Sequence, residues 1–288
     1  MIAEQLDSET FRMLLGDPTE VERAWGHERH YHIDQKKLGT YQQQLKATVY
    51  HHHSSFDYAI ELKELGFPQT AQAMQEERSG LPSLHETQMG NLGEVLGTEY
   101  GRWLLGFETT LVLPKRFNPN LEQSMKGVDI LGTTSSDERP ALLLGEAKCH
   151  KKLALRRDIV PMSLVLSSQR EKGKGEPEKK PDPIQSSYTH LVSLHQHNAA
   201  KLLLFAKEIL RVQGNTKDLA NLERVCDLSS IVERSTLMFI VTQHDHPDLF
   251  KSLDALFGNS PLPNLLAVHV CIENLENWLP KIFGVSEA

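Results

Sequence analysis

Three charged residues between positions 129 and 148 have the types and the spacing of a site that binds a divalent metal ion. Asp129 lies in a short apolar run, residues 128–131, and Glu146 and Lys148 lie at the end of a second apolar run, residues 141–147. A polar turn joins the two runs, as in a strand, a turn and a strand. Side chains at positions i and i+2 of a strand point to the same face, so Glu146 and Lys148 should emerge side by side. If the strands pair, Asp129 comes close to both.

These groups predict metal-assisted hydrolysis of a phosphodiester. Oxygen ligands suit Mg²⁺ or Mn²⁺, and a carboxylate in an apolar stretch costs free energy unless it is paired or bound to a cation. We expect Asp129, Glu146 and the backbone carbonyl of Ala147 to bind the metal, which lowers the pKa of a bound water. Lys148 would orient or help deprotonate that water, or stabilise the charge on the phosphate. The alternative is a surface ion pair between Glu146 and Lys148, which contributes about 0.2–1 kcal/mol.

A fourth carboxylate, Glu94, lies in a stretch whose apolar spacing predicts a helix over residues 89–105. Each glycine in a helix costs up to about 1 kcal/mol, so a glycine-rich helix is best explained if it lies close against a sheet. Four glycines recur here: Gly90, Gly93, Gly97 and Gly101. Glu94 is a candidate for the first or second shell of the metal site, and the alternative is a solvent-facing helix carboxylate.

The elements that must position these residues alternate between strands and helices. Strands are expected at residues 109–113, 128–131, 141–147, 235–242 and 265–272. Helices are expected at residues 9–15, 58–65, 89–105, 188–211, 217–226, 247–257 and 275–283. Strands separated by helices indicate an α/β fold with helices on the faces of a sheet.

The chain divides in composition near residue 85. Residues 1–85 are expected to form a mainly helical N-terminal region that faces a partner, and residues 86–288 to form the domain that carries the site. Residues 169–187 are rich in Lys, Glu, Gly and Pro, which predicts a mobile loop.

Histidines gather in the N-terminal region, at His27, His30 and His32 and in the triplet His51–His53. They suggest either a metal site or a solvated loop or partner-facing surface. No pair of histidines four residues apart lies on a clearly amphipathic helix, which favours the second interpretation.

Basic residues follow the acidic group directly, and they are candidates for contacts with a phosphate backbone. These candidates are Lys151, Lys152, Arg156 and Arg157, together with Lys126, which lies just before Asp129. The alternative is a solvated helix face. The net charge of -7 argues against coating of nucleic acid by the whole chain, although it permits a local basic groove.

The composition is that of an ordinary globular protein, with 24% charged and 39% hydrophobic residues among 288. Three widely separated cysteines without CxxC spacing indicate a reducing compartment. Acidic residues near the N-terminus do not fit a signal peptide, and no apolar run is long enough to span a membrane. We therefore expect a cytoplasmic protein.

The pattern of Gly-Val-Asp129-Ile and Gly-Glu146-Ala-Lys148, preceded by Gly-Asn-Leu-Gly-Glu94, resembles the PD-(D/E)xK nuclease superfamily. The resemblance implies a restriction-endonuclease-like core, which is a mixed central sheet flanked by helices. It also implies an Mg²⁺-dependent deoxyribonuclease in which Glu94, Asp129, Glu146 and Lys148 are catalytic. The order of helix, three strands, helix and strand inferred above is similar to that core.

Within the superfamily, the chain most resembles HamA, the nuclease family of bacterial Hachiman anti-phage systems. This resemblance implies an effector that cleaves DNA and is held in check by a helicase subunit, HamB. The chain departs from the Q-x-x-x-Y motif of RecB-like relatives, because Gln185 and Tyr188 are only three residues apart. The alternatives are a stand-alone restriction or repair nuclease, and a non-catalytic DNA-binding or scaffold subunit with the same fold.

Overall fold

The computed structural model describes most of the predicted core. The described residues are 4–53, 81–107, 109–111, 128–134, 141–151, 183–198, 233–258 and 261–284, with single positions between residues 203 and 223.

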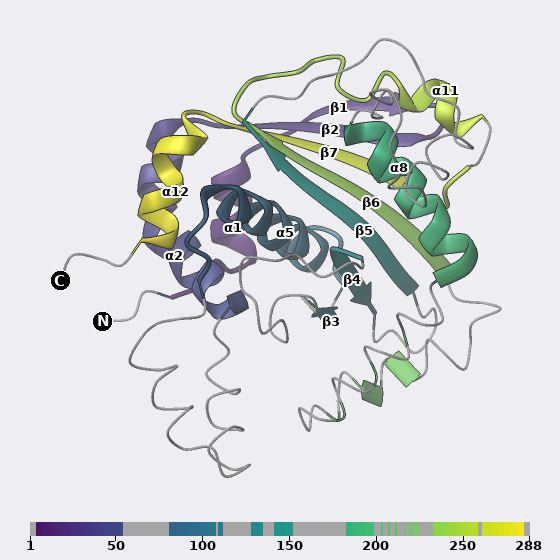
Figure 1. The fold of residues 1–288 in the computed structure, drawn as a ribbon, viewed down its shortest axis with the longest axis horizontal. Coiled ribbons are helices and arrows are strands. Elements are labelled where there is room, and N and C mark those ends of the chain that lie inside the picture. Colours follow the sequence, from purple (N-terminus) through teal and green to yellow (C-terminus); the bar gives the residue numbers. More distant parts are fainter. Residues whose placement is uncertain are drawn as a thin grey trace, which may run out of the picture.

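Seven strands form one mixed sheet (Figure 1). The strands are β1 (Thr19–Arg23), β2 (Gly26–Ile33), β3 (Thr109–Leu111), β4 (Ile130–Thr133), β5 (Ala141–His150), β6 (Glu233–Thr242) and β7 (Leu265–Ile272). Their spatial order is β1-β2-β7-β6-β5-β4-β3. Strands β2, β7, β6 and β5 are mutually parallel, whereas β1, β4 and β3 pair antiparallel with their neighbours. The mixed α/β fold predicted from the sequence is therefore confirmed.

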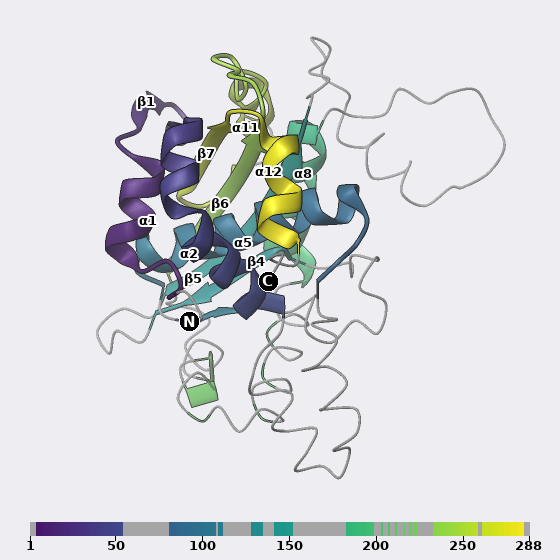
Figure 2. The same ribbon diagram turned by 90° about the vertical axis from the view of Figure 1, so that its left-hand side faces the viewer.

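Helices cover both faces of this sheet (Figures 1 and 2). One face packs against α1 (Ser8–Leu15), α2 (Gln35–His53), α5 (His85–Trp103) and α12 (Leu275–Phe283). The other packs against α8 (Pro183–Ser193), which continues into a π-helical turn, η1 (Leu194–Asn198), and against the short α11 (Leu253–Phe257). The central strands read as continuous apolar runs because both of their faces are buried.

Helix α5 lies very close to the sheet, as its glycines predict. A Cβ atom added to Gly93 would lie 3.0 Å from the Cβ of Cys149, and one added to Gly97 would lie 2.6 Å from Cδ1 of Ile130. Larger side chains at these positions would hold the helix away from β4 and β5. The glycines thus bring Glu94 toward the strands that carry the other candidate site residues.

Several predicted elements are confirmed at their boundaries. Strand β7 and helix α12 match the predicted residues 265–272 and 275–283, and β6 begins two residues before the predicted strand. The observed order α5, β3, β4, β5, α8, β6 is the predicted order of helix, three strands, helix and strand. The expected helix at 58–65 lies outside the described residues.

The N-terminal region requires a correction, because it contributes two strands in addition to α1 and α2. The histidine-rich residues 26–33 form β2, which pairs with β7 inside the sheet, and are not a solvated loop. The pattern was misleading because polar side chains of β2 pair with each other: Glu28 is buried, and the half-buried His30 contacts it. Two strands of this region therefore belong to the same sheet as the elements after residue 86. The division near residue 85 and the partner-facing role of the region remain predictions.

The loop predicted at 169–187 ends earlier than expected. Helix α8 begins at Pro183, because proline is favoured in the first helical turn, where its missing N–H is not needed. Residues 169–182 lie outside the described residues. The helix predicted at 188–211 therefore begins five residues early, and it changes to a π-helical turn at Leu194. The helix predicted at 247–257 is a run of turns followed by α11.

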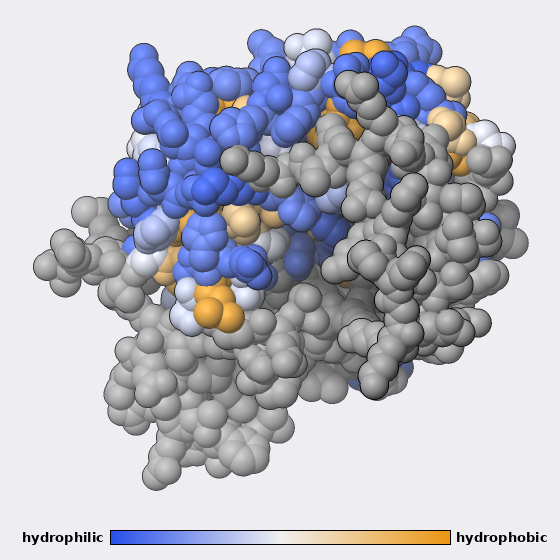
Figure 3. Space-filling model, turned by 45° about the horizontal axis from the view of Figure 1, so that its top comes forward, coloured by the Kyte–Doolittle hydropathy of each residue, from blue (hydrophilic) through white to orange (hydrophobic). Residues whose placement is uncertain are grey.

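In the view of Figure 3, the described surface is mainly hydrophilic, with small, separate hydrophobic patches. The large apolar side chains that are exposed among the described residues are Met13, Tyr50 and Leu84. None of the described helices combines the length and the apolar character needed to cross a lipid bilayer.

Candidate active site

The antiparallel pairing of β4 and β5 brings Asp129, Glu146 and Lys148 together. Ile130 pairs with Gly145, so Asp129, one residue before β4, lies beside the end of β5 that carries Glu146 and Lys148. The sequence predicted Asp129 to lie inside the first of these strands, but in the structure it lies one residue before β4 begins. Its Oδ2 accepts a hydrogen bond of 3.0 Å from the backbone N–H of Ala147, which fixes the carboxylate against the strand.

The ammonium group of Lys148 lies where the predicted metal ligands converge. Its Nζ donates to Asp129 Oδ2 at 3.3 Å, to the carbonyl oxygen of Ala147 at 3.2 Å and to Oε1 of Glu146. These are the three groups that the sequence predicts to bind a divalent cation. A metal ion at the position of this ammonium group would have three oxygen ligands. Carboxylate and carbonyl oxygens are the ligands that Mg²⁺ and Mn²⁺ prefer. In this structure the ammonium group of Lys148 supplies the positive charge among the three oxygens.

His190 belongs to the same group and was missed by the sequence reading. Helix α8 packs on β5 and places Nδ1 of His190 2.8 Å from Oε2 of Glu146. The two oxygens of Glu146 therefore have different partners, His190 and Lys148. No local spacing connects residues 44 positions apart, so only the packing of the helix on the strand reveals this contact.

Burial and mutual charge set the protonation of the group. Burial, with a further contribution from the charge of Glu146, raises the pKa of Asp129 to about 7, although Lys148 opposes the shift. Burial would also raise the pKa of Glu146, but the hydrogen bond from His190 and the charge of Lys148 together lower it. The two carboxylates raise the pKa of Lys148 despite its burial, and the hydrogen bond to Glu146 raises that of His190. Asp129 is thus the carboxyl group that would gain most from a further cation.

Glu94 is buried in α5, with only 8% of its surface exposed. The interpretation as a solvent-facing helix carboxylate is therefore wrong. Its charge is one of the causes that raise the pKa of Asp129, so the two carboxylates act on each other electrostatically. The close approach of Gly93 to the backbone of β5 explains how a helix on the opposite face of the sheet reaches the site.

Of the basic residues predicted to contact nucleic acid, Lys151 is the one that lies among the described residues. Lys151 forms an ion pair of 2.6 Å with Glu276 of α12. The remaining candidates, Lys126, Lys152, Arg156 and Arg157, lie outside the described residues. The contact of the basic run with DNA stays a prediction.

The histidine triplet has a structural role that neither interpretation anticipated. His52 is buried at the end of α2, and its Nε2 lies 2.7 Å from Oε1 of Glu99 on α5. His53 is also buried, and its Nε2 pairs with Asn91 on α5 at 2.8 Å. These contacts join the two helices, so His52 and His53 are neither solvated nor part of a metal cluster among the described residues.

Comparison with known proteins identifies the family of the chain. A family model described as HamA matches residues 22–254. The chain belongs to the HamA family. The matched range includes the four predicted catalytic residues and His190, and the match confirms the resemblance to HamA. The curated Hachiman protein HamA of Bacillus cereus is 43% identical over 67 residues, so the match spans 23% of this chain and 23% of the length of that relative.

Proposed function

We propose that this HamA-family chain is a metal-dependent DNA endonuclease and the effector subunit of a bacterial anti-phage defence complex. The proposal rests above all on one observation: the oxygens of Asp129, Glu146 and the Ala147 carbonyl converge on a single cationic atom. The core order α5, β3, β4, β5, α8, β6, with β6 parallel to β5, supports a restriction-endonuclease-like core of the PD-(D/E)xK type.

Asp129, Glu146 and the Ala147 carbonyl would hold Mg²⁺ or Mn²⁺, with Glu94 completing the acidic environment. When bound, such an ion supplies a water of lowered pKa and neutralises charge on the phosphate. The backbone N–H of Ala147 orients Asp129, and His190 orients Glu146 through its second oxygen.

The environment of Lys148 bears on its two predicted roles. Neighbouring carboxylates raise its pKa, so the group stays protonated at neutral pH. A protonated ammonium stabilises the negative charge that develops on the phosphate, and it is a poor acceptor of a proton from water. Both predicted roles of Lys148 stay open for the metal-bound chain, because a divalent ion on the same carboxylates would lower the pKa of Lys148 again.

Membership of the HamA family supports the role in anti-phage defence. We infer from it a helicase subunit, HamB-like, that restrains the nuclease until foreign DNA is sensed. Co-purification of the chain with an ATP-dependent helicase encoded beside it tests this partner. A chain that purifies alone and restricts phage without the helicase would instead favour a stand-alone nuclease.

Plasmid cleavage by the purified chain, with and without the helicase, tests the activity. We expect cleavage in Mg²⁺ or Mn²⁺, none in EDTA, and none by Asp129→Asn, which keeps the shape of the side chain. Near-ultraviolet circular dichroism checks that the variant is folded. Equal cleavage in EDTA and Mg²⁺ would overturn the proposal.

A further inference from the structure

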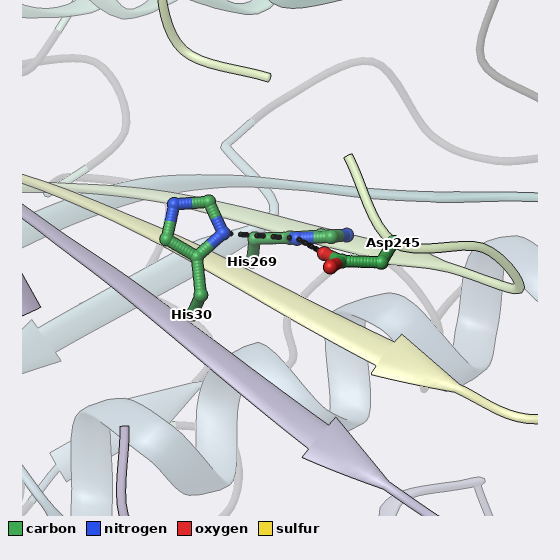
Figure 4. Close-up of side chains that lie close together, drawn as sticks. All are labelled: His30, Asp245 and His269. Carbon is green, nitrogen blue, oxygen red and sulfur yellow. Dashed lines mark hydrogen bonds and ion pairs between the residues drawn. The ribbon is translucent and has the colours of Figure 1, made fainter. Parts of the chain in front are cut away.

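A second group of metal-binding residue types lies outside the candidate active site. His30 on β2, His269 on β7 and Asp245 in the turn after β6 each place one potential ligand atom within 4.8 Å of the other two (Figure 4). His30 and His269 are direct neighbours in the register of β2 and β7. Segments from three distant parts of the sequence thus meet at one point.

The hydrogen bonds of His30 fix the position of its proton. Nε2 lies 2.5 Å from Oε1 of Glu28, and the other oxygen of Glu28 forms an ion pair of 2.7 Å with Arg23. A carboxylate paired with arginine accepts hydrogen bonds and does not donate them, so Nε2 of His30 carries the proton. Nδ1, on the side toward His269, is left with its lone pair when the ring is neutral.

The same reasoning applies to His269. Its Nε2 lies 2.7 Å from Oγ1 of Thr242, whose single hydroxyl proton is donated to the carbonyl oxygen of His244 at 2.5 Å. The hydroxyl oxygen must therefore accept from the imidazole, and Nε2 of His269 carries the proton. Nδ1 of this ring is also left with its lone pair.

Two lone pairs consequently face each other, since the Nδ1 atoms of His30 and His269 are 3.2 Å apart. This arrangement requires a positive species between them. Two imidazole nitrogens bound to one tetrahedral zinc ion lie about 3.3–3.4 Å apart, given bonds of about 2.0–2.1 Å. The observed separation is close to that value.

Asp245 adds a carboxylate to the two nitrogens. Its Oδ1 lies 3.9 Å from Nδ1 of His269, and its side chain is 70% exposed. His246 follows it, with its ring centroid 6.2 Å from that of His269. Its Nε2 is buried and has no hydrogen-bond partner in the described part of the chain. His246 is a candidate fourth ligand, with water as the alternative.

We propose that His30, His269 and Asp245 bind a zinc ion that fastens β2 and the turn after β6 to β7. Two imidazoles and one carboxylate suit Zn²⁺ better than Mg²⁺, which prefers oxygen ligands only. Glu28 and Thr242 hold the two rings in the tautomers that leave Nδ1 available, the usual role of outer partners of metal-bound histidine.

This site is separate from the one proposed to cleave DNA. Lys148 pairs with Ile240, and Ile240 pairs with His269, so one strand lies between the two groups on the same face of the sheet. Neighbouring strands are about 4.8 Å apart, which puts the Cα atoms of Lys148 and His269 roughly 10 Å from each other. Zinc binding can therefore be measured without reference to DNA cleavage.

The test is the zinc content of the full-length chain, stripped with EDTA, loaded with Zn²⁺ and dialysed in buffer containing Mg²⁺. We expect one bound equivalent by mass spectrometry in the wild-type chain and in Asp129→Asn. His30→Ala and His269→Ala should lose it, and Asp245→Ala should bind zinc at least about tenfold more weakly. The matched control is His27→Ala, an exposed histidine on the same strand, which should retain one equivalent.

Zinc should also raise the melting temperature of the wild-type chain more than that of Asp245→Ala, an exposed position whose change leaves the core intact. Absence of bound zinc in the wild-type chain would overturn the proposal, and would mean that a proton lies between the two rings. Retention of the zinc by Asp245→Ala and His30→Ala at wild-type affinity would overturn it equally.

Discussion

At the scale of single residues, the candidate active site is a balance of buried charges. Glu146 is 5% exposed and is held by Lys148 and His190, while Asp129 keeps a raised pKa because its partners do not offset its burial. Asp129, Glu146 and Lys148 could be predicted from the sequence, because strand pairing and the two-residue period bring them together. His190 could not, since its contact depends on how α8 packs.

Replacing Lys148 by alanine should destabilise the chain in EDTA. The change leaves Asp129 and Glu146 without their shared cation, and we expect a loss of about 1–3 kcal/mol, below the cost for a fully buried pair because Lys148 is partly exposed. Mg²⁺ should restore more stability to this variant than to the wild-type chain. Thermal unfolding with and without Mg²⁺ measures both effects. Equal stability of Lys148→Ala and the exposed control Lys251→Ala in EDTA would contradict this account.

At the scale of elements, α5 and β2 show how far the sequence pattern predicts the structure. The recurrence of glycine predicted a helix close to a sheet, and the structure agrees. By contrast, β2 was misread because its buried face carries Glu28 and His30, which satisfy each other. Period and polarity cannot distinguish such a polar network from a solvated loop, because its burial depends on the pairing of β2 with β7, which is distant in the sequence.

Two glycines of α5 should respond in opposite ways to alanine. In Gly97→Ala, the new methyl group meets the buried side chain of Ile130 at 2.6 Å and Phe239 at 3.3 Å, so we expect a loss of about 1–2 kcal/mol. In Gly90→Ala no atom lies within 4 Å, and improved helix propensity should add about 0.5–1 kcal/mol. Urea unfolding compares the two variants. A destabilised Gly90→Ala beside an unaffected Gly97→Ala would show that α5 does not pack on the sheet as described.

The turn η1 should contribute to acid sensitivity through His195. Burial, with a smaller contribution from Arg234, lowers the pKa of His195 from 6.5 to about 4, and its Nε2 lies 3.0 Å from Oγ1 of Thr236 on β6. Between these pKa values the unfolded chain binds a proton that the folded chain does not, so stability falls as the pH falls from 6.5 to 4.

In His195→Gln this contribution disappears, and the free energy of unfolding should depend less steeply on pH across the same interval. Urea unfolding at several pH values gives the two slopes. The prediction fails if the slopes of wild type and variant coincide.

At the scale of the whole molecule, one sheet joins the N-terminal hairpin of β1 and β2 to the strands that carry the candidate site. The apolar strands β6 and β7 and the amphipathic α12 could be predicted because burial and periodicity determine them locally. The place of the hairpin beside β7 could not, because it depends on a pairing across more than 200 residues of sequence. The histidines that mark this junction are those proposed to bind zinc.

The initial rate of plasmid cleavage in Mg²⁺ tests the central claim most directly, when wild type, Glu146→Gln and Lys251→Ala are compared under one set of conditions. Glu146→Gln keeps the shape of the side chain but removes the charge that is expected to bind the metal. We predict a rate at least about a hundredfold lower for Glu146→Gln and an unchanged rate for Lys251→Ala, each with wild-type folding. Cleavage by folded Glu146→Gln at the wild-type rate would contradict the account.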